Sequence, residues 1–236
     1  MGSNGNLSFA GSGTAVNGTT SSAVAGIGAC NQGNGISTAG GATYGTPALI
    51  PTQSLPVPPQ PNPLPPTKGQ NINSSQVLAP GTYGDLKIQG GAVVTLPGGT
   101  PGNPAVYTMN SLSLAGGASL VVNGPVVINI AGVGQQNPID FTGGSFQNNT
   151  YVPGDFVMNY GGTNNISVQG GSAAYAVINA PKANISFSGG SNFYGQVIGG
   201  TITDTGGTNI YYDKSLNTPG PNNNAFFEIA MRELSY

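Results

Sequence analysis

The chain has 236 residues, of which 40 are Gly and 19 are Pro, while only 5% are charged and the net charge is −2. With five Lys and Arg residues in total, it cannot form the basic groove that nucleic-acid binding requires. It has no His and one cysteine, Cys30, which excludes the common His-dependent metal and nucleophile sites and an intrachain disulfide.

Residues 1–46 carry weak versions of a strand repeat. Apolar and polar residues alternate over residues 6–13, and residues 36–41 end in a Gly-Gly pair. We interpret them as one or two atypical coils at an end of a stack, because terminal repeats face solvent on one side.

Residues 47–69 form a proline-rich linker. Nine of the 19 prolines lie between Pro47 and Pro66, and proline has no amide hydrogen to give to a central strand. We predict an extended polyproline-type strap, in which roughly sixteen residues at about 3.1 Å each reach about 50 Å. That length could run along the side of a stack. Recognition of the strap by a partner is the alternative to a simple connector.

Residues 70–217 contain the main repeat, typified by Ile185-Ser186-Phe187-Ser188-Gly189-Gly190. Copies of this pattern of apolar, polar, apolar, polar, Gly and Gly occupy residues 86–91, 112–117, 139–144, 166–171 and, as a variant, 202–207. The alternation predicts a strand with one buried face, and the Gly-Gly pair predicts a corner. Repetition at this period favours a parallel β-helix over an antiparallel sandwich with Gly-Gly hairpins.

The tail, residues 218–236, breaks this pattern and is predicted to cap an exposed edge of the stack. Its sequence from Ala225 to Tyr236 is strongly apolar, yet its periodicity fits a strand and a helix equally well.

In the repeat register, one polar position of each copy falls in a single outward column, formed by Lys87, Ser113, Asp140, Ser167, Ser186 and Thr203. Lys87 and Asp140 lie two coils apart, about 10 Å, which does not make a catalytic pair. In each of Phe193-Tyr194 and Tyr211-Tyr212, one ring should point inward and one outward. The candidate ligand-facing residues are therefore Tyr194, Tyr212, Ser167, Ser186 and Thr203.

Asp204 occupies an apolar position of the variant copy. We interpret it as a corner carboxylate that caps backbone amides, in preference to a metal ligand.

Residues 78–93, 172–214 and the closing Arg232-Glu233-Leu234 resemble PilX-like, type IV pilus assembly-associated bacterial surface proteins. The resemblance covers roughly residues 70–236. It implies a Gly-rich β-helix domain, which in this family follows a membrane-anchored, pilin-like N-terminus. It implies no catalytic residue.

Together these observations predict an all-β protein, a right-handed parallel β-helix (solenoid) with a proline-rich strap and a C-terminal capping segment. We expect a secreted or cell-surface structural and adhesive module, pilus-associated, with no signal or anchor in this chain and no membrane insertion by it. The alternatives are a carbohydrate-binding β-helix and, less favoured, a polysaccharide-active enzyme or a self-assembling filament subunit. We expect no enzyme activity, cofactor or metal. Expected partners are surface or pilus proteins, polysaccharide, and other copies through the coil ends.

Overall fold

The protein is all-β in the part of the chain that the computed structural model describes, residues 2–3, 7–11, 15–16, 20–22, 35–49, 51, 54–169, 174–190, 192–205 and 207–217. These ranges contain no α-helix, only the short 3-10 helices η1 (Pro153–Asp155) and η2 (Lys214–Asn217). Every pairing between named strands is parallel. The predicted all-β, parallel-strand architecture is confirmed, and an antiparallel sandwich is excluded for these strands.

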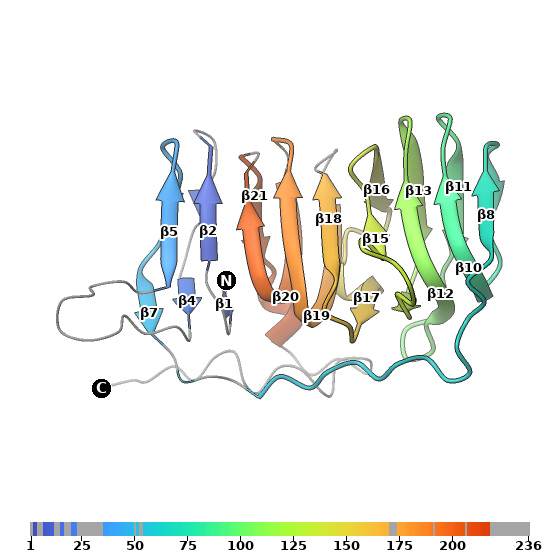
Figure 1. Ribbon diagram of the computed structural model, residues 1–236, viewed down its shortest axis with the longest axis horizontal. Helices are drawn as coiled ribbons and strands as arrows, with labels where there is room; N and C mark the ends of the chain where they lie inside the picture. The colour runs from blue at the N-terminus through green and yellow to red at the C-terminus, as the bar shows by residue number, and fades with distance from the viewer. Residues whose placement is uncertain are drawn as a thin grey trace.

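Three parallel ladders surround one elongated core (Figure 1). The first ladder holds the strands of the Gly-Gly repeat, in the spatial order β5 (Ile36–Ala39), β2 (Leu7–Ala10), β20 (Asn192–Asp204), β19 (Ala174–Ser188), β18 (Asn165–Gln169), β15 (Ile139–Asp140), β12 (Ala105–Leu114), β10 (Gly81–Ile88) and β8 (Gly69–Ile72).

The second ladder uses the N-terminal halves of the long strands β10, β12, β19 and β20, together with β14 (Val126–Ile130), β17 (Phe156–Tyr160) and β21 (Asn209–Tyr212). The third ladder contains β9 (Gln76–Val77), β11 (Val93–Pro97), β13 (Ala118–Asn123) and β16 (Gly144–Asn148). Near the N-terminus, β1 (Gly2–Ser3), β4 (Thr20–Ser22) and β7 (Pro47–Leu49) pair with one another, as do β3 (Ala15–Val16) and β6 (Thr43–Tyr44).

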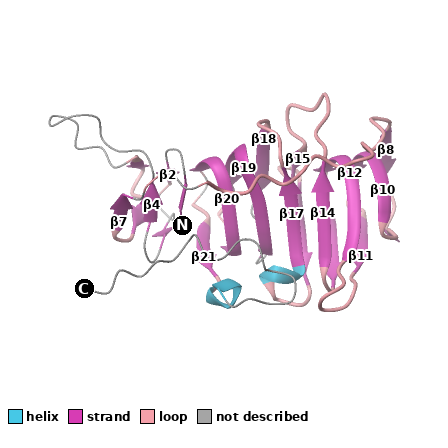
Figure 2. Cartoon of the chain, turned by 90° about the horizontal axis from the view of Figure 1, so that it is seen from below, coloured by secondary structure: helices cyan, strands magenta, loops and turns pink. Residues whose placement is uncertain are grey.

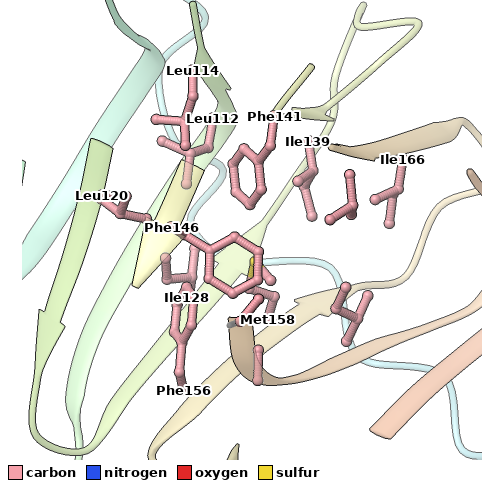
Figure 3. Close-up of a cluster of buried hydrophobic side chains, with 14 of the residues drawn as sticks. Leu112, Leu114, Leu120, Ile128, Ile139, Phe141, Phe146, Phe156, Met158 and Ile166 are labelled. Carbon is pink, nitrogen blue, oxygen red and sulfur yellow. The ribbon is translucent and has the colours of Figure 1, made fainter. Parts of the chain in front are cut away.

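The repeat forms strands because its alternating residues place apolar side chains on one face and polar side chains on the other. Ile185 and Phe187 are each 1% exposed, while the alternating residues Ser186 and Ser188 point outward. At the corner that follows the first full copy, Gly90 and Gly91 have φ of +67° and +71°, a conformation that residues with a Cβ rarely adopt. Side chains from different ladders then meet in the core (Figure 3). Phe146 lies 5.5 Å, ring centre to ring centre, from both Phe141 and Phe156.

The spatial order of the strands departs from their order in the chain. The N-terminal strand β2 pairs with β20, with Leu7 beside Ile202 and Phe9 beside Asp204. Figure 1 shows the blue N-terminal strands next to the orange strands of the last repeats. The N-terminal repeats thus do form an end of the first ladder, and it is the end beyond the last repeats, not the one beside β8.

With this order, the N-terminal strands and β8 lie at opposite ends of the first ladder, and the proline-rich strap connects them. Residues 54–68 contain no strand and run along the length of the ladders from the N-terminal strands to β8 (Figure 1). Gln60 Nε2 donates to the carbonyl oxygen of Ala131 at 3.1 Å, and the amide of Asp85 donates to the carbonyl oxygen of Lys68 at 3.1 Å. A Cβ on Gly84 would lie 2.1 Å from that same Lys68 oxygen, so glycine is required where the strap joins the ladder.

The strap differs from the prediction at its start, because β7 already occupies residues 47–49. β7 is the last strand of the N-terminal set, so the strap begins only after it. The predicted C-terminal cap, residues 218–236, lies outside the described residues.

Candidate functional site

The first ladder carries an unbroken column of polar side chains, here called the polar column. The predicted register of Lys87, Ser113, Asp140, Ser167, Ser186 and Thr203 is confirmed, since each residue pairs with the next. The column extends further at both ends, and its full order is Asn71, Lys87, Ser113, Asp140, Ser167, Ser186, Thr203, Ser8 and Ser37. Nine strands at about 4.8 Å make it roughly 38 Å long.

Most side chains of the polar column keep their hydrogen-bonding capacity free. Ser167, Ser186 and Thr203 are partly exposed, and their hydroxyl groups form no hydrogen bond with any described residue. Asp140 is the exception, because its Oδ1 accepts from the amide and the hydroxyl of Thr142 at 3.0 and 2.7 Å. The column is therefore a flat row of donors and acceptors.

The second ladder carries a different outward feature, the tyrosine stack, formed by Tyr175, Tyr194 and Tyr211. Tyr175 and Tyr194 are stacked with ring centres 4.7 Å apart and planes at 12°, and Tyr194 and Tyr211 follow at 4.9 Å and 14°. Their strands place these residues side by side in register. Both faces of the Tyr194 ring are consequently covered by neighbouring rings, so no ligand can stack on Tyr194.

Tyr212, the other predicted ligand-facing tyrosine, lies outside this stack. Side chains in β21 alternate, so that Ile210 is 7% exposed and Tyr211 is 36% exposed. Burial, and secondarily the neighbouring carboxylate of Asp213, raises the pKa of the Tyr212 phenol. Of the Phe193-Tyr194 pair, Phe193 points inward at 2% exposure, as predicted.

Hydrogen bonds between asparagine side chains, which the sequence analysis missed, link neighbouring turns of all three ladders. Asn179 Nδ2 donates to Asn159 Oδ1 at 3.2 Å, and Asn159 Nδ2 donates to Asn129 Oδ1 at 3.1 Å. Further pairs of the same kind join Asn184 to Asn165, Asn209 to Asn192 and Asn149 to Asn123. Asparagine at equivalent positions of successive copies was the signal that could have revealed them. Because these amides donate to one another, they hold neighbouring strands together, although the buried Oδ1 of Asn179 accepts no hydrogen bond from a described residue.

Asp204 sits where the N-terminal repeats join the last repeat. It is 1% exposed and lies in register between Phe187 and Phe9. Its Oδ1 accepts a long hydrogen bond, 3.4 Å, from the amide of Thr208, which agrees with a corner carboxylate that caps backbone amides. In the described part of the chain, no group of three or more Cys, Asp and Glu side chains gathers to hold a metal ion.

Comparison with known proteins gives one informative result. No curated protein and no solved structure matches the chain significantly. A family model described as "Putative Ice-binding-like adhesive domain" matches residues 2–210, which include the N-terminal strands, the strap and the main repeats. This match supports an adhesive surface protein, the coarser part of the predicted role, but does not itself point to a pilus.

The described residues include no helix with the length and apolar character of a membrane span. The family match covers most of the chain, and an adhesive domain acts at a surface. The chain belongs to the family of ice-binding-like adhesive domains.

Proposed function

We propose that the chain is an extracellular adhesive module of a bacterial surface, in which a right-handed parallel β-helix holds the polar column against a hydrated, repetitive polymer. The observation that carries this proposal is the continuity of the column across strands from both ends of the chain. Its hydroxyl groups are free of internal hydrogen bonds within the described residues, so they can bond to a partner. Many weak, evenly spaced hydrogen bonds on a rigid support give strong attachment through multivalency.

The side chains of the column favour a polysaccharide over ice as the surface. Ice binding would call for a regular threonine array, whereas Asn71, Lys87 and Asp140 interrupt the row of serine and threonine. Charged and amide groups suit the hydroxyls of a sugar polymer, which accept and donate hydrogen bonds at varied positions.

We also propose that the β-helix is right-handed and that the module is displayed at a pilus. Parallel crossovers are right-handed in nearly all proteins, which supports a right-handed helix. The resemblance of residues 70–236 to PilX-like proteins supports display at a pilus. We propose no catalytic turnover, and incubation with cellulose or chitin should release no soluble sugar.

A bead-retention assay tests the polar column. Beads coated with the chain are passed over cellulose and chitin films, and the wild type is compared with the triple variant S167V/S186V/T203V. Valine is well suited to a strand, matches the shape of threonine, and removes the hydroxyl at all three positions. We expect retention to fall at least about tenfold, the effect of losing roughly 1.4 kcal/mol across three hydrogen bonds of about 0.5 kcal/mol or more.

The matched control is S119V/S145V, which removes two outward serines of the third ladder that contact each other at 3.3 Å. This control should retain beads as well as the wild type. Undiminished retention by the triple variant would refute the column as the binding surface. Thermal hysteresis in the wild type would instead identify ice as the surface.

Self-association through the ends of the ladder is a second way in which copies could meet. In the first ladder, β8 pairs with β10 on one side and, among the residues that the structure describes, with no strand on its other side. Open edges of this kind accept further strands. Sedimentation velocity over a concentration series would show growing species if the ends join, and a constant monomer if they do not.

A further inference from the structure

The loop between β16 and β17 holds a strained and exposed aromatic residue. Tyr151 has φ of +58°, and it is the one residue other than glycine with positive φ in the described part of the chain. Its side chain is 62% exposed. A tyrosine in the left-handed region is unfavourable, and such strain is found preferentially at binding sites, where the surrounding structure enforces it.

Asn148 is the residue that enforces this conformation. Its side chain is fully buried, and its Nδ2 donates to the carbonyl oxygens of Val152 at 2.9 Å and of Tyr175 at 3.2 Å. Its Oδ1 accepts from the amide and the hydroxyl of Thr150 at 3.1 and 2.9 Å. Its own carbonyl oxygen accepts from the Tyr151 amide at 3.2 Å. The loop is therefore fixed on both sides of Tyr151, and the ring is presented in one place.

The orientation of Tyr151 differs from that of the tyrosine stack. Its ring lies 5.4 Å from the Tyr175 ring, with an interplanar angle of 86°. The rings in the stack cover one another's faces, whereas the 62% exposure of Tyr151 leaves at least one face of its ring open to solvent. Val152 beside it is 46% exposed and enlarges the apolar surface.

We propose that Tyr151 is a sugar-stacking residue that binds a pyranose ring of a neutral polysaccharide, at a site separate from the polar column. The C–H groups on the face of a pyranose ring pack against the open face of an aromatic side chain. The segment from Phe141 to Phe156 contains one charged residue, Asp155, and no Lys or Arg. It has no cation to attract an acidic sugar, and the single carboxylate disfavours one. Because the loop is already rigid, binding loses little conformational entropy.

Three substitutions at Tyr151 distinguish the effect of the aromatic ring on binding from the effect of the strained backbone. Y151F keeps the ring, Y151A removes it, and Y151G removes it and also relieves the left-handed backbone. The probe is a glycan array of neutral hexose and N-acetylhexosamine oligosaccharides, followed by isothermal titration calorimetry of the hits, a readout that does not depend on the substituted tyrosine.

We expect Y151F to bind within about twofold of the wild type, and Y151A and Y151G to lose at least about tenfold in affinity. Y151G should melt at the same temperature as the wild type or higher, which would show that the strained tyrosine is kept for binding and not for stability. The matched control is Y211A, an exposed ring at the end of the tyrosine stack, whose loss should leave affinity unchanged.

Absence of glycan binding by the wild type, or wild-type affinity in Y151G, would overturn the proposal. The variant S167V/S186V/T203V distinguishes this site from the polar column, because it should keep its affinity on the array while losing bead retention. Loss of array binding in that variant would show that the two surfaces are one site, contrary to the proposal.

Discussion

The first and second ladders share the long strands β10, β12, β19 and β20, yet their outward surfaces differ in chemistry. On the second ladder, tyrosine rings stack on one another and asparagine amides bond to one another across successive strands. On the first ladder, the hydroxyls of Ser167, Ser186 and Thr203 bond to no described residue. Side chains that satisfy each other stabilise the stack, and side chains that do not are available to a partner.

The distinction predicts that substitutions on the second ladder change stability, while those on the polar column change binding. Both surfaces share the same buried core, in which inward side chains of the three ladders interlock (Figure 3). Figure 2 shows both short helices, η1 and η2, on the same side of the strands. η1 packs against the second-ladder strands β17, β19 and β20, which adds to the cover over that ladder.

The largest effect is expected at Gly195 of the second ladder. Its φ is +138°, and a Cβ there would lie 2.0 Å from the carbonyl oxygen of Ala176 on the neighbouring strand. G195A should lower the free energy of unfolding by about 3–5 kcal/mol, measured by urea denaturation with circular dichroism. G134A is the control, because Gly134 has φ of +72° but nothing within 4 Å of an added Cβ, and it should lose only about 1 kcal/mol.

A smaller effect is expected for the tyrosine stack. Y194A removes a ring that is stacked on both sides and should lower the free energy of unfolding by about 2 kcal/mol. Y211A removes an end ring with one stacked neighbour and should lose about 1 kcal/mol. Thermal melting of both variants tests the order. Equal losses for the two would mean that stacking contributes nothing beyond burial.

Little change in stability is expected on the polar column. S186A removes a hydroxyl with no partner among the described residues, so its free energy of unfolding should stay within about 0.5 kcal/mol of the wild type. The same urea titration measures it. A loss comparable to that of Y194A would mean that the column also holds the stack together, and the contrast between the two ladders would disappear.

The ionisation of Tyr107 should leave the free energy of unfolding unchanged at neutral pH and should lower it only in alkali. Its single hydroxyl proton is shared between the carbonyl oxygens of Leu78 and Pro97, which lie 3.0 and 3.1 Å away. Burial, and secondarily Tyr83, raises the pKa of its phenol to about 12 from the ordinary 10.0. The folded state therefore keeps a proton that the unfolded state releases, and stability should fall as pH rises from about 10 to about 12.

Urea denaturation across this pH range checks the prediction, and Y107F should flatten the decline. Y107F also loses the hydrogen bonding of this hydroxyl, so its stability at neutral pH is expected to be lower. The slope against pH, and not the absolute value, is therefore the quantity to compare. An unchanged slope in Y107F would assign the alkaline loss to other groups.

The sequence predicted much of the polar column and less of the aromatic surface. Alternation with period two fixes which side chains share a face, so Ser167, Ser186 and Thr203 could be aligned from the repeat alone. The choice between Tyr211 and Tyr212 depended on which residues of the four-residue strand β21 point outward, and the Gly-Gly repeat does not include this strand. Tyr151 could not be found this way, because its conformation is imposed by Asn148 and not by any local pattern.

By itself, the sequence determined the strands, their inward and outward sides and the glycine corners, because these depend on residues close together in the chain. It also determined that residues 54–68 could not be a central strand, since proline has no amide hydrogen. Only the tertiary structure decided that β2 packs against β20, that the strap spans the length of the ladders, and which side chains satisfy one another. Those outcomes depend on contacts between segments that are far apart in the sequence. Strands with the same alternation of apolar and polar residues can pair with one another equally well, so the local sequence does not select the partner.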